Sequence, residues 1–115
     1  MDEQEYLYWN SSQLIHAYNK KDLSPVDVIE ASIKRARKIQ PICNAITEFF
    51  EEKAINMAKE AERSYLGKSH KPRLLEGIPL AVKEEFALEG SYRTSGSFIH
   101  KDRIDDYTDV YIKRL

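Results

Sequence analysis

Apolar residues recur at helical spacing in four segments of this 115-residue chain. In the second segment, Val26, Ile29 and Ile33 share one face, while lysines and arginines occupy the opposite face. This arrangement is typical of an amphipathic helix packed on a core. Ser24 and Pro25 supply a capping side chain and a suitable first residue for that helix. The pattern predicts helices over residues 11–20, 25–39, 51–66 and 106–115.

Local signals predict where these helices begin and end. Asp106, with Asp109 three residues later, imitates a capping box at the start of the last helix. Residues 43–49 alternate loosely between apolar and polar positions, which predicts a short extended piece. We further expect Ser11 or Ser12 to cap the first helix, Pro41 to stop the second and Gly67 to end the third.

A strand is predicted over residues 78–83. Ile78, Leu80 and Val82 alternate onto one face, and the other face is apolar until Lys83. Two apolar faces predict a strand covered on both sides, as in a parallel or mixed α/β sheet. A single strand cannot bury both faces without neighbours. We therefore expect an α/β fold that is incomplete within this chain, the front of something larger.

Charge and cysteine content exclude several classes of protein. The chain has 18 Lys and Arg against 19 Asp and Glu, which gives no electrostatic reason to expect a nucleic acid partner. A single cysteine, Cys43, cannot form an internal disulfide. No apolar stretch approaches the roughly 20 residues that cross a bilayer. We expect a cytoplasmic protein with no membrane segment, no metal motif and no cofactor motif.

Lys83 is the main candidate for chemistry, and two interpretations of it are open. Its ammonium group can reach water along its aliphatic stem, or it can be desolvated, give up its proton and act as a base or nucleophile. Glu84 and Glu85 follow directly, and neighbours on an extended segment point to opposite faces. At most one of these carboxylates is therefore expected to pair with Lys83.

Ser95 and Ser97 flank Gly96 and are the hydroxyls that could imitate a nucleophile turn. A nucleophile elbow requires a strand before the serine and a helix after it. The flanks here are typical of loops, so we interpret both as turn serines.

Several segments resemble the amidase signature family. Ser24–Ala31 and Pro41–Ala45 resemble its N-terminal helices. Leu75–Lys83, with the sequence Leu-Glu-Gly-Ile-Pro-Leu-Ala-Val-Lys, resembles the family's Gly-Ile-Pro-x-x-Val-Lys strand. Thr94–Ser97 resembles its Thr-x-Gly-Ser turn, and Asp109–Leu115 resembles the helix that leads toward the active-site half.

The resemblance implies that residues 1–115 are the N-terminal portion of a single amidase domain. It implies that the intact protein hydrolyses a small-molecule carboxylic acid amide and that Lys83 is the proton-relay base of a Ser–cis-Ser–Lys triad. No nucleophile is expected in this chain, because the family's Gly-Gly-Ser-Ser-Gly-Gly-type segment is absent. These residues alone are therefore expected to be inactive and to need the remainder of the domain to cover their apolar faces. The residues expected to support the lysine are Glu84, Thr94, Gly96 and Ser97.

Two departures from the family pattern lie close to the lysine. Glu84 stands where the family usually has aspartate, and Arg93 stands where it has the first threonine of the turn. Two alternative functions remain. The chain could be a free-standing, non-catalytic module that binds a protein partner through its apolar stripe. It could also be the start of a glutamyl-tRNA amidotransferase A-type subunit.

Overall fold

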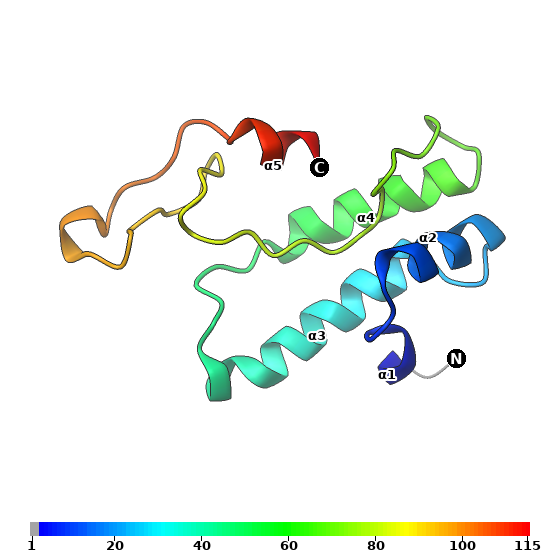
Figure 1. Ribbon diagram of the computed structural model, residues 1–115, viewed down its shortest axis with the longest axis horizontal. Coiled ribbons are helices and arrows are strands. Elements are labelled where there is room, and N and C mark those ends of the chain that lie inside the picture. The colour runs from blue at the N-terminus through cyan, green and yellow to red at the C-terminus, as the bar shows by residue number, and fades with distance from the viewer. Residues whose placement is uncertain (1–2) are drawn as a thin grey trace. The chain divides into compact units, whose positions relative to one another are not determined.

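The computed structural model describes residues 3–115 and divides into two compact units, Met1–Pro79 and Leu80–Leu115. Figure 1 shows that helices dominate the first unit and that irregular backbone dominates the second. The first unit holds α1 (Glu3–Tyr6), α2 (Ser11–Lys20), α3 (Pro25–Cys43) and α4 (Glu51–Tyr65). The second unit holds the 3₁₀ turn η1 (Phe98–His100) and α5 (Val110–Arg114).

The first unit is built on the pairing of α3 with α4, which lie side by side in Figure 1. α1 contacts α3, and α2 contacts α4. Apolar faces at helical spacing meet between these helices and exclude water. The buried cluster consists of Tyr6, Leu14, Ala17, Tyr18, Leu23, Val28 and Ala31.

Capping bonds define the starts of α2 and α3. The Ser24 hydroxyl accepts a hydrogen bond from the Val26 N–H at 3.0 Å, as its position before Pro25 predicts. The same hydroxyl donates to Glu62 Oε1 at 2.6 Å and so ties the start of α3 to α4. For α2 the predicted cap, Ser11 or Ser12, is wrong. Asn10 is the cap, because its side chain and that of Gln13 bond each other's backbone N–H groups.

Pro41 does not end α3, which continues to Cys43. A proline in the last turn removes only one backbone hydrogen bond, and Asn44 then closes the helix in the left-handed conformation at φ 46°. The extended piece predicted over residues 43–49 is not a strand. Its backbone at Ile46 bonds instead to the side chain of Gln40, at 2.7 and 3.0 Å.

The predicted strand over residues 78–83 is absent, and no strand occurs anywhere in residues 3–115. The structure that is described is helical, so the α/β expectation is not confirmed by it. The physical reason is that a strand is defined by a hydrogen-bonded neighbour. Residues 78–83 have none here, and Leu80 keeps 57% of its surface exposed.

The second unit is a long hairpin-like loop without regular strands. Backbone bonds join its two sides: Gly90 N–H to Asp105 C=O at 2.9 Å, Asp105 N–H to Ser91 C=O at 3.0 Å, and Arg93 N–H to Arg103 C=O at 3.0 Å. Ala87 in this unit is fully buried.

The helix predicted over residues 106–115 is shorter than expected and begins at Val110. The Asp109 carboxylate accepts from the Ala87 N–H at 2.8 Å instead of capping the helix. The Thr108 hydroxyl likewise accepts from the Glu89 N–H at 3.0 Å. These bonds to residues 87–89 hold the preceding segment out of the helix. Within residues 3–115, none of the helices is long and apolar enough to cross a membrane.

Candidate functional site

Lys83 lies on the surface of the second unit. Its side chain is 74% exposed, and its Nζ atom lies 3.4 Å from Glu85 Oε1. Glu85 is itself 57% exposed, so this is a solvated ion pair of small energetic value. Of the two carboxylates that follow the lysine, the structure therefore pairs it with the second.

The Glu84 carboxylate is directed to the turn at Thr94. Its Oε1 atom accepts hydrogen bonds from the Thr94 N–H at 2.9 Å and from the Thr94 hydroxyl at 2.8 Å. These bonds, with the positive charge of Arg103, hold the pKa of Glu84 below its ordinary value. Glu84 is charged at neutral pH, and its side chain is bonded to a residue ten positions later in the sequence.

The turn itself needs two residues in the left-handed conformation. Ser95 has φ 52° and Gly96 has φ 67°, and the Ser97 N–H bonds back to the Thr94 carbonyl at 3.0 Å. This is the geometry of a type I′ turn. The Gly96 N–H also donates to the Thr94 hydroxyl at 3.2 Å. The four residues predicted to support the lysine, Glu84, Thr94, Gly96 and Ser97, thus form one connected group.

Both turn serines make structural contacts. The Ser97 hydroxyl accepts from the Ile99 N–H at 3.3 Å and caps η1. The Ser95 hydroxyl accepts from the Arg103 guanidinium at 2.9 Å. These are the roles of turn residues, in agreement with the interpretation from sequence.

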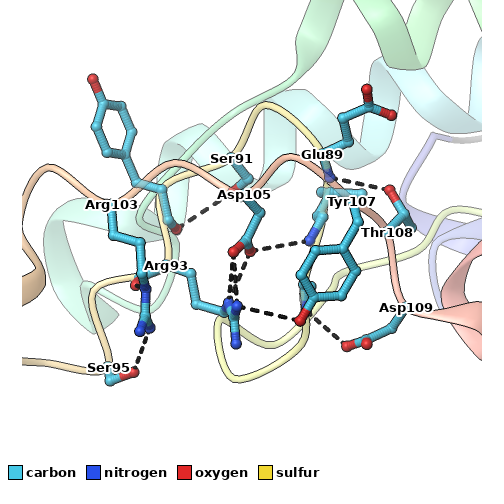
Figure 2. Close-up of polar contacts among 12 residues, drawn as sticks. Glu89, Ser91, Arg93, Ser95, Arg103, Asp105, Tyr107, Thr108 and Asp109 are labelled. Carbon is cyan, nitrogen blue, oxygen red and sulfur yellow. Dashed lines mark hydrogen bonds and ion pairs between the residues drawn. The ribbon is translucent and has the colours of Figure 1, made fainter.

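An ion pair between Arg93 and Asp105 was missed at the level of sequence. Arg93 Nε lies 2.9 and 2.8 Å from the two Asp105 oxygens, and Arg93 Nη2 lies 2.8 Å from Oδ1. Figure 2 shows the guanidinium facing this carboxylate, with the Tyr107 hydroxyl beside it. In the sequence, Arg93 stood out because the family pattern has threonine at its position. Nothing in the sequence marked Asp105, twelve residues later, as its partner.

Asp105 is buried, with 3% of its side-chain surface exposed. The hydrogen bonds from Arg93 hold the pKa of Asp105 below its ordinary value, although burial acts in the opposite direction. The Leu88 N–H donates to the same carboxylate at 3.3 Å. A buried carboxylate that meets a bidentate guanidinium and a backbone donor is a rigid attachment point.

The start of the Gly-Ile-Pro segment is anchored in the first unit. The Tyr18 hydroxyl donates to the Gly77 carbonyl at 3.1 Å, and the Tyr65 hydroxyl donates to the Glu76 carbonyl at 3.0 Å. Burial raises the pKa of Tyr18, so its hydroxyl remains a donor at neutral pH. Gly77 adopts φ 78°, which favours glycine. Two neighbouring carbonyls are thereby fixed by side chains from α2 and α4.

The part of the chain that is described, residues 3–115, contains no group of three or more His, Cys, Asp or Glu side chains placed to hold a metal ion.

Comparisons with known proteins place these features in a family context. A family model described as Amidase matches residues 27–115. The chain is 33% identical over 104 residues to the A subunit of the mitochondrial glutamyl-tRNA(Gln) amidotransferase of Ixodes scapularis, with 90% of this chain and 20% of that protein covered. It is 29% identical over 104 residues to the human fatty-acid amide hydrolase 2, with 85% and 20% covered.

The chain is also 29% identical over 116 residues to the acylamidase of Rhodococcus erythropolis, with 100% of this chain and 24% of that protein covered. It therefore spans between a fifth and a quarter of the length of these relatives. The matched region includes Lys83, Glu84 and the Thr94 turn.

Proposed function

Because this chain belongs to the amidase family, we propose that it supplies the N-terminal portion of an enzyme that hydrolyses a carboxylic acid amide. The observation that carries this proposal is the family match over residues 27–115, which includes the lysine segment and the turn that anchors it. The human amide hydrolase and the bacterial acylamidase among the relatives are named for reactions of this class.

In the proposed reaction Lys83 is the base of a Ser–cis-Ser–Lys triad. The neutral amine accepts a proton through a bridging serine from a nucleophilic serine. The nucleophile attacks the amide carbonyl, the amine leaves with a proton, and water then hydrolyses the acyl-enzyme. Both serines are proposed to come from sequence outside these 115 residues, because Ser95 and Ser97 are engaged in the turn.

A catalytic role for Lys83 requires it to be covered. A lysine in contact with water stays protonated at neutral pH, whereas a desolvated lysine loses its charge more easily. In the proposal, strands from further sequence pair with residues 78–83 and build the α/β sheet that the alternation of Ile78, Leu80 and Val82 predicts. This pairing also covers Lys83, whose side chain is 74% exposed in the present structure.

The test uses the protein expressed at its native length and a chromogenic anilide as the amide. Lys83→Ala is expected to lower kcat by roughly 100-fold to 10,000-fold, the usual worth of a positioned base. Lys101→Ala, which removes an exposed lysine from η1's C-terminal side, is the matched control and should leave kcat unchanged. An equally active Lys83→Ala protein contradicts the proposal.

Residues 1–115 expressed alone provide a second check. They are expected to show no turnover, because the proposal places both serines elsewhere. Turnover by this segment that disappears in Lys83→Ala would instead place the nucleophile within it.

A second candidate function is that of an amidotransferase A-type subunit. The observation in its favour is the 33% identity to the Ixodes protein, whose name assigns it to glutamyl-tRNA(Gln). A protein of this kind would work with partner subunits and take its nitrogen from an amide. Release of ammonia from glutamine that increases when partner subunits are added supports this candidate. Hydrolysis of the anilide by the single protein supports the simple amidase.

A further inference from the structure

The turn that anchors Glu84 is held from its other side by the Arg93–Asp105 pair. Thr94 follows Arg93 directly and donates both its N–H and its hydroxyl to Glu84, at 2.9 and 2.8 Å. Glu84 in turn follows Lys83 directly. A short chain of contacts therefore leads from Asp105 through Arg93, Thr94 and Glu84 to the lysine backbone.

Asp105 can serve as the fixed end of this series of contacts because hydrogen bonds hold both its backbone and its side chain. Its backbone N–H bonds to the Ser91 carbonyl at 3.0 Å, and its carbonyl accepts from the Gly90 N–H at 2.9 Å. Its carboxylate is buried and meets one edge of the Arg93 guanidinium, formed by Nε and Nη2. Figure 2 shows Asp105 at the centre of these contacts.

The planar guanidinium matters for this geometry. Arg93 meets the carboxylate with Nε and Nη2, a forked arrangement that fixes orientation as well as distance. A lysine would supply the same charge from one nitrogen and leave the orientation free. The Arg93 carbonyl is also held, since it accepts from Arg103 Nε at 2.6 Å.

We propose that Arg93 and Asp105 are positioning residues for Lys83. The pair fixes the Thr94 turn, the turn fixes Glu84, and Glu84 fixes the backbone from which Lys83 projects. Arg93 therefore takes over an anchoring role at a position where the family pattern has threonine. This inference rests on the proposed function, because it concerns the placement of the proposed base.

The experiment uses the protein at its native length, with Arg93→Gln, Arg93→Lys and Asp105→Asn as variants. Arg93→Gln and Asp105→Asn are expected to lower kcat roughly 10-fold to 100-fold, the effect of a small misplacement of a catalytic group. KM should change by less than about twofold, because neither residue is proposed to contact the substrate. Arg93→Lys should recover only part of kcat. Lys101→Gln, which removes a positive charge from the same loop, should leave kcat unchanged.

Hydrogen exchange measured by mass spectrometry separates positioning from general stability. In Arg93→Gln, peptides that contain Thr94 should exchange faster, while peptides from α5, which lies in the same unit, should keep the wild-type rate. Faster exchange in both regions would assign the pair to fold stability and overturn the positioning role.

Two further results are decisive. Wild-type kcat in Arg93→Gln and Asp105→Asn overturns the positioning role and leaves the proposed function standing. A wild-type protein that hydrolyses neither the anilide nor glutamine overturns the proposed function, and the positioning role fails with it.

Discussion

One oxygen of the Glu84 carboxylate receives two hydrogen bonds from Thr94, at 2.9 Å from the N–H and at 2.8 Å from the hydroxyl. The same hydroxyl accepts from the Gly96 N–H at 3.2 Å. Thr94 therefore links the segment after Lys83 to a turn that is closed by its own backbone. This single side chain joins two parts of the second unit that sequence spacing does not bring together.

Replacement of the Thr94 hydroxyl should weaken the second unit. Thr94→Val keeps the backbone N–H and the branched shape but removes one bond to a charged group and the acceptor for Gly96. We expect the free energy of unfolding of residues 80–115 to fall by about 1–2 kcal/mol. A urea titration followed by the NMR cross-peaks of these residues measures it. Thr47→Val, at an exposed position, should change stability by less than about 0.5 kcal/mol; equal effects contradict the assignment.

The second unit should lose stability in acid. Glu84 and Asp105 both have a folded-state pKa below the ordinary values of 4.5 and 3.8. Their charged forms stabilise the fold above those values, and this stability is lost as the pH falls through the lower folded-state pKa values. We expect a constant free energy of unfolding between about pH 7 and pH 5 and a decline below about pH 4.5.

Urea titrations at several pH values test this decline. Glu84→Gln removes one of the two carboxylates whose lowered pKa predicts this decline, so the decline should become shallower. Glu85→Gln, which changes an exposed neighbouring carboxylate, should keep the wild-type profile. A decline that is unchanged in Glu84→Gln would show that the Thr94 bonds do not stabilise the charged carboxylate.

The helices of the first unit could be predicted because their signals are local. Apolar positions at helical spacing located α2, α3 and α4, and Ser24 with Pro25 located the start of α3. The errors there concern single turns. Asn10 caps α2 through Gln13, and Pro41 lies so near the end of α3 that its lost hydrogen bond does not stop the helix.

The second unit could not be predicted in the same way because its contacts join residues far apart in sequence. Asp109 bonds to Ala87, 22 residues earlier, so α5 starts later than its own pattern indicates. Arg93 and Asp105 share no periodicity that would pair them. The alternation over residues 78–83 was real, but a strand also needs a neighbour. Among the candidate site residues, the resemblance pointed to the Thr94 group, whose support of Lys83 stays a prediction, and the Arg93–Asp105 contact became visible in the structure.

Gly77 should tolerate no side chain. It adopts φ 78°, and an added Cβ would lie 2.9 Å from Pro25 Cβ and 3.0 Å from Pro25 Cγ. Pro25 is fully buried at the start of α3 and cannot move aside. Gly77→Ala should therefore destabilise the first unit by about 2–4 kcal/mol, from left-handed strain plus overpacking. Denaturation followed by the fluorescence of Trp9, the one tryptophan of the chain, measures this change.

Gly67→Ala separates the two causes. Gly67 lies in the same unit with φ 71°, and an added Cβ there would meet nothing within 4 Å. Its substitution should cost only the strain, about 1–2 kcal/mol. If Gly77→Ala costs no more than Gly67→Ala, the close approach to Pro25 has no energetic weight.

The two tyrosine hydroxyls that hold consecutive carbonyls should act together. Tyr18→Phe leaves the Gly77 carbonyl without its side-chain donor, and Tyr65→Phe does the same for Glu76. Each should cost about 1–2 kcal/mol, the usual penalty for a lost buried partner. Because the rings lie 5.3 Å apart and their carbonyls are adjacent, the double variant should cost less than the sum by about 0.5 kcal/mol or more.

The same fluorescence denaturation, applied to all four members of the cycle, measures this coupling. Tyr8→Phe is the matched control, since the Tyr8 side chain is 77% exposed, and it should change stability by less than about 0.5 kcal/mol. Strictly additive effects of Tyr18→Phe and Tyr65→Phe would mean that each hydroxyl holds its own carbonyl independently. Coupled effects would show that α2 and α4 fix the start of the Gly-Ile-Pro segment as one anchor, because release of either carbonyl loosens the other.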